Sequence, residues 1–365
     1  MRVGILISGS LNSLSGGFLY DRMLVDQLRD NGHEVYVFSL LGQSYSKRLL
    51  ENYSPSLVKK IMQKRLDILL QDELEHPALF FLNQRLQNQI SCPIISIVHH
   101  LRSEEWRPSW QNHLYRIIER RYLLSVDGFI FNSETTQASV YQLCGKEGNG
   151  VVAYPCGNPK LVPNITEAEI AERAIESGPL RIIFVGNVIR RKGLHILLSS
   201  LMHLPSESCF LTVIGSLSAD RVYVRTIQKQ IQANRLESRV TLMDAVPDGE
   251  LTAHLKSAQL LAVPSFYEGF GIVYLEGMGF GLPAIGSSAG GAREVITHDE
   301  SGFLTPAGDV SALVEYIGTL SRNRELLSVM ARKAYQRYMV HPNWSQTFQN
   351  VAAFLRSFLP RTRLA

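Results

Sequence analysis

The sequence predicts an α/β protein made of two doubly wound, Rossmann-like domains. Short apolar, β-branched runs alternate with segments of helical period along the chain, a pattern typical of parallel strands joined by crossover helices. The alternation pauses between residues 154 and 178, which are rich in proline and glycine. A chain of 365 residues is also long for one domain and sufficient for two. We therefore place a domain boundary at residues 165/166.

Each half of the chain contains five runs that we predict to be strands. In the first half these are residues 3–7, 34–39, 93–98, 128–131 and 151–154. In the second half they are residues 181–185, 210–214, 240–243, 260–264 and 283–286. Ligands of such sheets bind outside the carboxyl ends of the strands, so functional side chains are expected directly after these runs.

Composition and charge exclude several classes of protein. The net charge of +4 is small and diffuse, which argues against a nucleic-acid partner. No apolar run is long enough to span a bilayer, and the apolar N-terminus is predicted to be a strand, not a signal peptide. The four cysteines are widely spaced, as expected for reduced thiols without zinc. We expect a cytoplasmic protein.

The richest stretch of polar and glycine residues is the segment 264–276. A strand is expected to end at Pro264 and a helix to begin near Gly271, whose free backbone N–H groups suit an anion or an electron-rich oxygen. Glu268 lies in the loop, where a carboxylate can accept hydrogen bonds from sugar hydroxyls. Glu276 lies near the start of the helix, where it can hold a ribose diol. A plain glycine turn with one surface glutamate and one glutamate on a helix face explains the same residues about equally well.

The spacing of these glutamates resembles a family signature. Glu268 and Glu276 are separated by seven residues, with Gly269-Phe270-Gly271 between them. This matches the E-x7-E signature of glycosyltransferase family 4, a retaining family of GT-B fold. The resemblance covers most of residues 180–310 and extends to Phe184-Val185-Gly186, Lys192-Gly193, Gly281-Leu282-Pro283-Ala284-Ile285 and Gly290-Gly291-Ala292-Arg293-Glu294.

The resemblance implies an architecture and an activity. It implies two domains facing across a cleft, with residues 1–165 plus 344–365 on the acceptor side and residues 166–343 binding a nucleoside-diphosphate sugar. It implies transfer of the sugar to a saccharide or a lipid-linked acceptor with retention of configuration, and no metal or other cofactor. The apolar residues within 343–359 resemble the closing helix that returns to the first domain.

A cationic loop follows the strand predicted at 181–185. Its adjacent Arg190, Arg191 and Lys192 could neutralise a diphosphate leaving group, and the other interpretation is a solvated basic turn. The family usually has an arginine directly after Gly186, but this chain has Asn187. We carry the lysine role over to Lys192 and leave the arginine role to Arg190 or Arg191, with a preference for Arg191.

Two features of the first half resemble the same family more loosely. Gly16 and Gly17 follow the first strand and would let the backbone approach a diphosphate. His99 follows the run 93–98, at the position of a family histidine close to the reacting sugar, although an isolated histidine is more often a core residue. His100 occupies the next position, where the family usually has an acid.

Three alternatives remain open at this point. Ser288 lies in a G-x-S-x-G pattern typical of serine hydrolases, followed by Asp299 or Asp309 and then His341. A catalytically silent protein that binds nucleotide-sugars would also fit, since Asn187 and His100 depart from the family pattern.

The third alternative concerns the membrane. Residues 56–70 show helical spacing of Val58, Ile61, Met62, Leu66 and Leu69 beside a basic face. This pattern is compatible with peripheral contact with the inner membrane face. Because residues 1–170 are neutral overall, we prefer a helix that covers the sheet and exposes its basic face to solvent.

Overall fold

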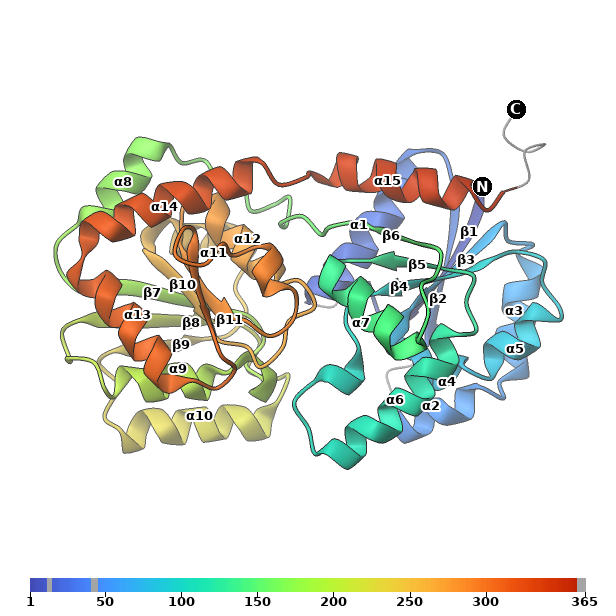
Figure 1. Cartoon of the computed structure of the whole chain (residues 1–365), viewed down its shortest axis with the longest axis horizontal. Coiled ribbons are helices and arrows are strands. Elements are labelled where there is room, and N and C mark those ends of the chain that lie inside the picture. The colour runs from blue at the N-terminus through green and yellow to red at the C-terminus, as the bar shows by residue number, and fades with distance from the viewer. Residues whose placement is uncertain (12–14, 41–44, 360–365) are drawn as a thin grey trace. The chain divides into compact units, whose positions relative to one another are not determined.

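A computed structural model describes residues 1–11, 15–40 and 45–359. The chain divides into two compact units (Figure 1). Unit 1 comprises Met1–Pro155 together with the C-terminal stretch from Pro342, and unit 2 comprises Cys156–His341. The sequence-based boundaries lie at 165/166 and 343/344, and residues 360–365 of the predicted C-terminal segment lie outside the described residues.

Unit 1 contains a six-stranded parallel sheet in the order β2-β1-β3-β4-β5-β6. Its strands are β1 (Arg2–Ser8), β2 (Glu34–Leu40), β3 (Ile68–Asp72), β4 (Ile94–Val98), β5 (Gly128–Phe131) and β6 (Gly150–Val152). Its helices are α1 (Gly16–Asp30), α2 (Tyr45–Glu51), α3 (Pro55–Gln63), η1 (Glu73–Glu75), α4 (His76–Leu79), α5 (Leu82–Gln87), η2 (Arg102–Glu104), α6 (Ser109–Leu123), α7 (Glu134–Cys144) and α15 (Trp344–Arg356).

Unit 2 contains a second parallel sheet of six strands, in the order β12-β11-β10-β7-β8-β9. Its strands are β7 (Leu180–Val185), β8 (Cys209–Ile214), β9 (Val240–Met243), β10 (Leu260–Val263), β11 (Ala284–Ser287) and β12 (Gly302–Thr305). Its helices are α8 (Glu167–Ile175), η3 (Arg190–Lys192), α9 (Leu194–Leu201), α10 (Arg221–Ala233), α11 (Asp248–Ser257), α12 (Ile272–Gly279), η4 (Gly291–Glu294), α13 (Val310–Arg322) and α14 (Arg324–Met339).

Each sheet has a point where the strand order reverses. In unit 2 the reversal lies between β7 and β10, which pair directly, with Leu260 opposite Ile182. In unit 1 it lies between β1 and β3, with Val3 opposite Ile68. Ligands of doubly wound sheets bind at these switch points, outside the carboxyl ends of the strands. The loops that follow β7 and β10 are therefore the natural place for a site in unit 2.

Two apolar clusters cover the faces of the sheet in unit 1. Alternate residues of β1 divide between them, since Val3, Ile5 and Ile7 join one cluster and Leu6 joins the other. The first cluster also includes side chains of α15, such as Leu355, which is fully buried. Each fully buried side chain of this size contributes about 1.5–3 kcal/mol. This packing explains why the C-terminal helix belongs to unit 1, although more than 180 residues separate it from the first part of that unit in the sequence.

Ten of the twelve strands lie where the sequence predicts them, within two residues at each end. The prediction for residues 56–70 was wrong beyond Gln63, because the helix ends there and β3 follows. Arg65 adopts a left-handed conformation with φ of 45° and turns the chain toward the strand. The apolar run 68–70 continued the helical spacing by coincidence, and such short runs do not distinguish a strand from a buried helix.

The edge strand β12 was also missed in the sequence. It has four residues and begins at Gly302, and glycine disfavours strands. The structure explains the glycine, because a Cβ atom at residue 302 would lie 2.0 Å from the carbonyl oxygen of Ala284 on β11. The strand thus depends on a close backbone approach that sequence patterns do not reveal.

The close approach predicts a large cost for Gly302→Ala. The added methyl group must displace the backbone of β11, which should lower the free energy of unfolding by about 3 kcal/mol. Gly249→Ala is a matched control, because nothing lies within 4 Å of its added Cβ. The control should be neutral or stabilising by up to about 1 kcal/mol. Urea denaturation followed by circular dichroism measures both, and equal effects of the two substitutions would contradict the account of β12.

Candidate functional site

The two loops at the switch point of unit 2 are joined through their backbones. The N–H group of Phe266, after β10, donates a hydrogen bond of 2.8 Å to the carbonyl oxygen of Arg191, after β7. Gly193 has φ of +72°, and a Cβ atom there would lie 2.1 Å from the carbonyl oxygen of Pro264. Only glycine permits this approach. The Lys192-Gly193 motif therefore brings the cationic loop against the loop that carries Glu268.

Glu268 is the centre of the polar contacts in these loops. Its side chain is 8% exposed. Its Oε1 atom lies 2.5 Å from Lys192 Nζ and accepts a hydrogen bond of 2.5 Å from Ser265 Oγ. Its Oε2 atom lies 3.5 Å from Arg191 Nη1, which also donates a 2.7 Å hydrogen bond to the carbonyl oxygen of Tyr267. The sequence did not identify Ser265, which follows the strand end and precedes the motif.

The electrostatics of this cluster favour the charged state of Glu268. Burial raises the pKa of the carboxyl group, but Lys192 and then Arg191 outweigh burial and hold the pKa at about 2. Burial, with a further contribution from Arg191, lowers the pKa of Lys192, whereas Glu268 opposes this shift. At neutral pH the carboxylate is ionised, so two cations face one anion. The cluster therefore keeps a net positive charge.

The loop that contains Gly290 and Gly291 contacts the backbone of the same glutamate. The N–H group of Gly291 donates to the carbonyl oxygen of Glu268 at 2.8 Å, and Glu268 and Gly290 form a parallel β-bridge. A Cβ atom at residue 290 or 291 would lie 2.1 Å from a backbone oxygen of this loop. The glycine pair is thus required for packing. The same stretch carries the G-x-S-x-G pattern.

The contacts of the predicted hydrolase residues are structural. Asp309 is the N-cap of α13 and accepts a hydrogen bond from the Ala312 N–H group. Asp299 lies in a turn with φ of 64° and is 3.5 Å from His298. The carbonyl oxygen of Ser288 accepts a hydrogen bond from Arg293. These contacts give the hydrolase alternative no support.

Glu276 lies on α12 and contacts residues 157 and 158, near the start of unit 2. Its Oε1 atom accepts a 3.0 Å hydrogen bond from the Asn158 N–H group, and a Cβ atom at Gly157 would lie 3.3 Å from its side chain. Burial raises the pKa of Glu276 to about 7, with Asp248 adding to the shift and the Asn158 N–H group and Lys192 opposing it. Asn158 and Asp248, which hydrogen-bond each other at 3.0 Å, were not identified from the sequence.

The remaining predicted residues of this loop region lie near the start of α12. Gly271 occupies the N-cap position with φ of 94°, and no side chain caps the helix. Phe270 is buried, with its ring centroid 5.7 Å from that of His341. Of the two arginines left open above, Arg190 is exposed and Arg191 is the one that reaches Glu268. Asn187, at the position of the missing family arginine, is partly exposed.

In unit 1 the structure brings His99 to the glycine loop. A Cβ atom at Gly17 would lie 3.3 Å from the His99 ring, so a larger residue at position 17 would press on the histidine. Gly16 is the first residue of α1, after the N-cap Ser15. His99 Nε2 lies 3.1 Å from Asp21 Oδ1 on the same helix. The sequence analysis missed Asp21, which no motif marks.

Burial and the nearby carboxylates shift the pKa of His99 in opposite directions. Burial lowers the pKa of the imidazole, but Asp21 and then Asp72 and Glu73 raise it, to about 9 in sum. Burial raises the pKa of Asp72 well above its usual range, and the nearby Asp21 adds to this. Asp21, Asp72 and His99 each offer a ligand atom within 4.8 Å of the others, as do Glu73, His76 and Glu119, so either group could hold a metal ion.

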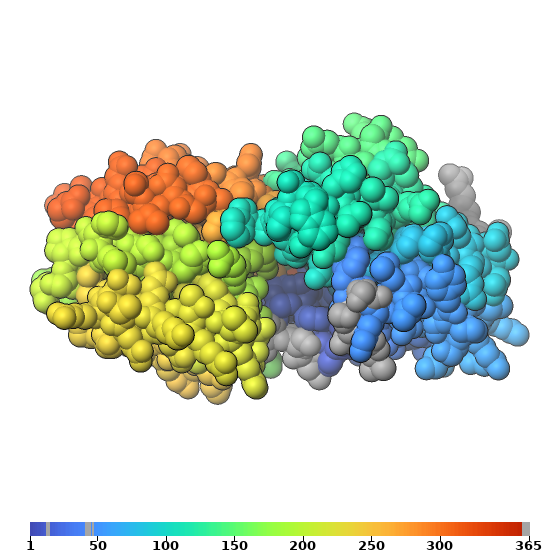
Figure 2. Space-filling view, turned by 90° about the horizontal axis from the view of Figure 1, so that it is seen from below, coloured from blue at the N-terminus to red at the C-terminus, as the bar shows by residue number. Residues whose placement is uncertain are grey.

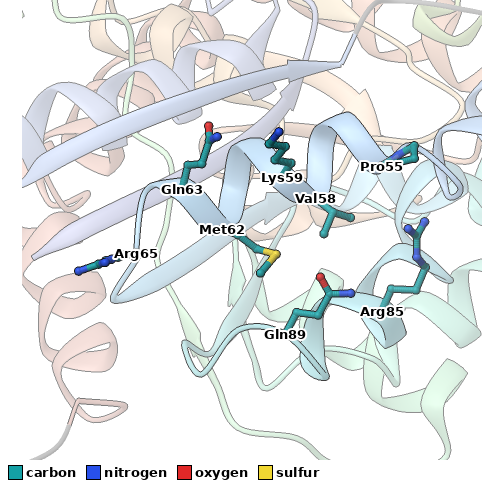
Figure 3. A pocket seen from close by; sticks show the side chains of 8 residues that line it. All are labelled: Pro55, Val58, Lys59, Met62, Gln63, Arg65, Arg85 and Gln89. Carbon is teal, nitrogen blue, oxygen red and sulfur yellow. The ribbon is translucent and has the colours of Figure 1, made fainter.

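The segment predicted as a basic amphipathic helix covers the sheet. The apolar residues Leu57, Val58 and Ile61 of α3 are buried in the core of unit 1, and Lys59 and Lys60 are exposed. A hollow of about 640 Å³ lies between α3 and α5 (Figure 3). It is lined by Pro55, Val58, Lys59, Met62, Gln63, Arg65, Arg85 and Gln89. None of the predicted catalytic or donor-binding residues lines it.

Most of the second unit matches a known family model. Residues 165–337 match the family model of glycosyl transferases group 1. This stretch contains the cationic loop, both glutamates and the glycine pair described above. The match and the relatives described next support a glycosyltransferase. They do not address the E-x7-E signature or family 4 itself.

Among curated proteins, the chain is similar to other glycosyltransferases. It is 32% identical over 160 residues to a D-inositol 3-phosphate glycosyltransferase of Xylanimonas cellulosilytica, which covers 43% of this chain and 38% of that protein. It is 32% identical over 154 residues to the amylovoran biosynthesis glycosyltransferase AmsK of Erwinia amylovora, covering 40% and 36%. The chain thus matches less than half the length of these relatives.

Solved structures resemble the whole chain. A sucrose-phosphate synthase from Thermosynechococcus elongatus has a TM-score of 0.83 at 20% identity, covering 98% of this chain and 99% of that one. HepE of Anabaena, solved in complex with UDP-glucose, has a TM-score of 0.74 at 21% identity, covering 97% and 99%. These likenesses confirm the predicted α/β fold of GT-B type. Among the described residues, no helix is both long and apolar enough to cross a membrane.

The pair of His99 and Asp21 predicts a protonated histidine at neutral pH. The raised pKa means that the pair stabilises the fold fully below about pH 6.5, the usual histidine pKa, and that this stability is lost as the pH rises through about 9. Asp21→Asn should lower the pKa of His99. NMR titration of labelled histidine, assigned with His99→Gln, measures the shift. A His99 that titrates near 6.5 in the unmodified protein would contradict the ion pair.

Proposed function

We propose that this protein transfers a sugar from a nucleoside-diphosphate sugar to an acceptor, with retention of anomeric configuration and without a metal ion. The observation that carries the proposal is the cluster of Lys192, Arg191 and Glu268 at the switch point of a doubly wound sheet. Two cations on one loop face a buried carboxylate on the other. This is the charge arrangement expected where a sugar is separated from a diphosphate.

The cations would act on the leaving group. Lys192 and Arg191 would contact the diphosphate and stabilise the charge that develops on it as the glycosidic bond breaks. They lie on a 3-10 turn held to the neighbouring loop by the hydrogen bond between Phe266 and Arg191, so they need little reorganisation. Gly269, Phe270 and Gly271 would bring backbone amides near the start of α12 toward the same ligand.

The two glutamates would bind different parts of the donor. Glu268, ionised and held by Lys192 and Ser265, would accept hydrogen bonds from the sugar hydroxyls. Glu276 would accept hydrogen bonds from the ribose diol. The loop residues 269–271 and about one turn of α12 separate them along the chain. In unit 1, Gly16 and Gly17 would let the backbone approach the diphosphate, and His99 would act close to the reacting sugar.

The base, the sugar and the acceptor remain open within this proposal. HepE was solved in complex with UDP-glucose, and the name of another relative specifies GDP-mannose and phosphatidylinositol monomannoside. Saccharide and lipid-linked acceptors are therefore both compatible with the proposal, and we place the protein in the cytoplasm. A catalytically silent nucleotide-sugar-binding protein is the second candidate, favoured by Asn187 and His100, and it would bind nucleotides without turnover.

A nucleoside diphosphate should stabilise the protein through Lys192. At a hundredfold excess over the dissociation constant, ligand binding stabilises by about 2.7 kcal/mol. Lys192→Ala removes one partner of a buried charge pair and should weaken binding by about 2–5 kcal/mol. Lys333→Ala, which removes an exposed cation of unit 2, is the control. Thermal shift with UDP, GDP and ADP measures all three proteins, and no shift with any nucleotide would refute the proposal.

The two glutamates should differ in kinetics. Glu268→Gln should lower kcat strongly, because the sugar changes charge during transfer, and should leave the affinity for the free diphosphate less affected than Lys192→Ala does. Glu276→Gln should raise the donor KM more than it lowers kcat, since the ribose does not change in the reaction. Steady-state kinetics with the sugar donor and calorimetry with the free diphosphate separate these effects. Identical losses in both variants would show that the two placements are wrong.

Glu276 also predicts a pH dependence of donor binding. If the ribose needs an ionised carboxylate, affinity should fall about tenfold per pH unit below its pKa of about 7. Glu276→Gln should bind more weakly and lose this dependence. Calorimetry between pH 5 and 8 tests it, and an unchanged pH profile in the variant would assign the dependence to another group.

Transfer should also survive removal of divalent metal. Since Arg191 and Lys192 would neutralise the leaving group, EDTA is expected to leave the initial rate unchanged. A rate abolished by EDTA and restored by Mg²⁺ or Mn²⁺ would contradict this expectation. It would show that a metal ion held by acidic residues stabilises the diphosphate.

A further inference from the structure

Helix α6 exposes apolar side chains on the side opposite to its core contacts. Trp110 is 64% exposed, Leu114 53% and Ile117 47%. Spaced four and three residues apart, they lie on one face of the helix. The opposite face carries Tyr122 and Leu123, which are buried in the core of unit 1. The outermost strip of this helix is therefore apolar, where a soluble surface helix normally has polar residues.

Trp106 precedes the helix by three residues and is 63% exposed, and we call Trp106, Trp110, Leu114 and Ile117 the α6 patch. Two of the three tryptophans of the chain are thus exposed on α6 or just before it, whereas Trp344 packs with its ring centroid 5.8 Å from that of Tyr20. A clustered apolar surface of this kind marks an interaction site.

The exposed charges on α6 itself are basic, while the segment before the helix carries Glu104 and Glu105. Arg116, Arg120 and Arg121 are exposed on α6, and its one acidic residue, Glu119, is buried. In the segment before the helix, the carboxylate of Glu105 is already paired, at 2.5 Å from Arg107. The partner of this surface should therefore be anionic.

We propose that the α6 patch docks unit 1 onto a membrane surface that contains anionic phospholipids. Tryptophan and aliphatic side chains partition into the boundary between headgroups and acyl chains, and arginines bind the lipid phosphates. A second copy of the chain fits less well, because a symmetric contact through α6 would bring Arg116 and Arg120 of both copies together. Figure 2 shows the teal segment that contains α6 on the molecular surface turned toward the viewer. The docking does not depend on the proposed transfer reaction.

Helix α3 provides a matched comparison within the same unit. It also has exposed cations, Lys59, Lys60 and the following Lys64, but Leu57, Val58 and Ile61 are buried and Met62, 42% exposed, is its one large apolar side chain at the surface. It offers charge with a single side chain that can insert between lipids, where α6 offers three. If docking requires both, α6 should bind membranes and α3 should not.

The test is co-sedimentation of the protein with vesicles of phosphatidylcholine alone, or of phosphatidylcholine and phosphatidylglycerol in equal amounts. We expect the unmodified protein to bind only the anionic vesicles. The triple variant Trp110→Gln, Leu114→Gln and Ile117→Gln should lose binding. Replacing Arg116 and Arg120 with Gln should weaken it about thirtyfold at low salt. The control variant, with Lys59, Lys60 and Lys64 replaced by Gln, removes more charge and should bind within about threefold of the unmodified protein.

A second measurement locates the contact directly. Brominated lipids should quench the tryptophan fluorescence of the bound protein, and Trp110→Phe, which keeps the apolar character, should bind normally with less quenching. The proposal is overturned if the unmodified protein stays in solution with anionic vesicles, or if the α6 triple variant binds as well as the unmodified protein. It is also overturned if the α3 variant alone loses binding. A concentration-dependent dimer that the α6 triple variant abolishes, without vesicle binding, would assign the patch to self-association instead.

Discussion

The contact between Glu268 and the cations of the β7–α9 loop is the constraint on which the site in unit 2 depends. It joins two loops separated by more than 70 residues, and its carboxylate is almost fully buried. Burying one charge without its partner costs several kcal/mol, so the ion pair fixes both loops together. The glycines around it follow from this geometry, since Gly193, Gly290 and Gly291 each lie where a Cβ atom would collide with backbone oxygen. Residues that look like a ligand motif in the sequence thus also serve the packing of three loops.

The same constraint affects how a donor would bind. Glu268 partly neutralises Lys192 and Arg191, which lowers the cost of keeping two cations close together. A diphosphate would compete for these cations and release the carboxylate toward the sugar. Binding of the leaving group and positioning of the sugar would then be coupled through one ion pair. Glu276, with a pKa near 7, is in contrast balanced between its two protonation states before the ribose arrives.

The sequence predicted the fold well where strands are buried runs rich in β-branched residues, as at β1 and β4. It failed at β3 and β12, where an apolar run continued a helical spacing and where a strand began at glycine. In the candidate site, Glu268 and Lys192 were predicted because family motifs marked them, and Arg191 because it lies beside Lys192 in a loop where the family arginine is missing. Asp21, Ser265 and Asn158 were not, because each acts through a contact made only in the folded chain: an ion pair with His99, and hydrogen bonds to Glu268 and Glu276. The exposed apolar face of α6 could not be predicted from the sequence either. Apolar residues at helical spacing normally indicate a buried face, and only the structure shows which face of the helix is covered.

Hydrogen–deuterium exchange with and without a saturating nucleoside diphosphate tests the central claim most directly. The claim is that the switch point of the sheet in unit 2 is the donor site. The account predicts that the ligand slows amide exchange in residues 186–194 and 264–276, with little change in β8, β9 and α10 of the same unit. Protection confined to unit 1, or spread evenly through unit 2 without these two loops standing out, would contradict it.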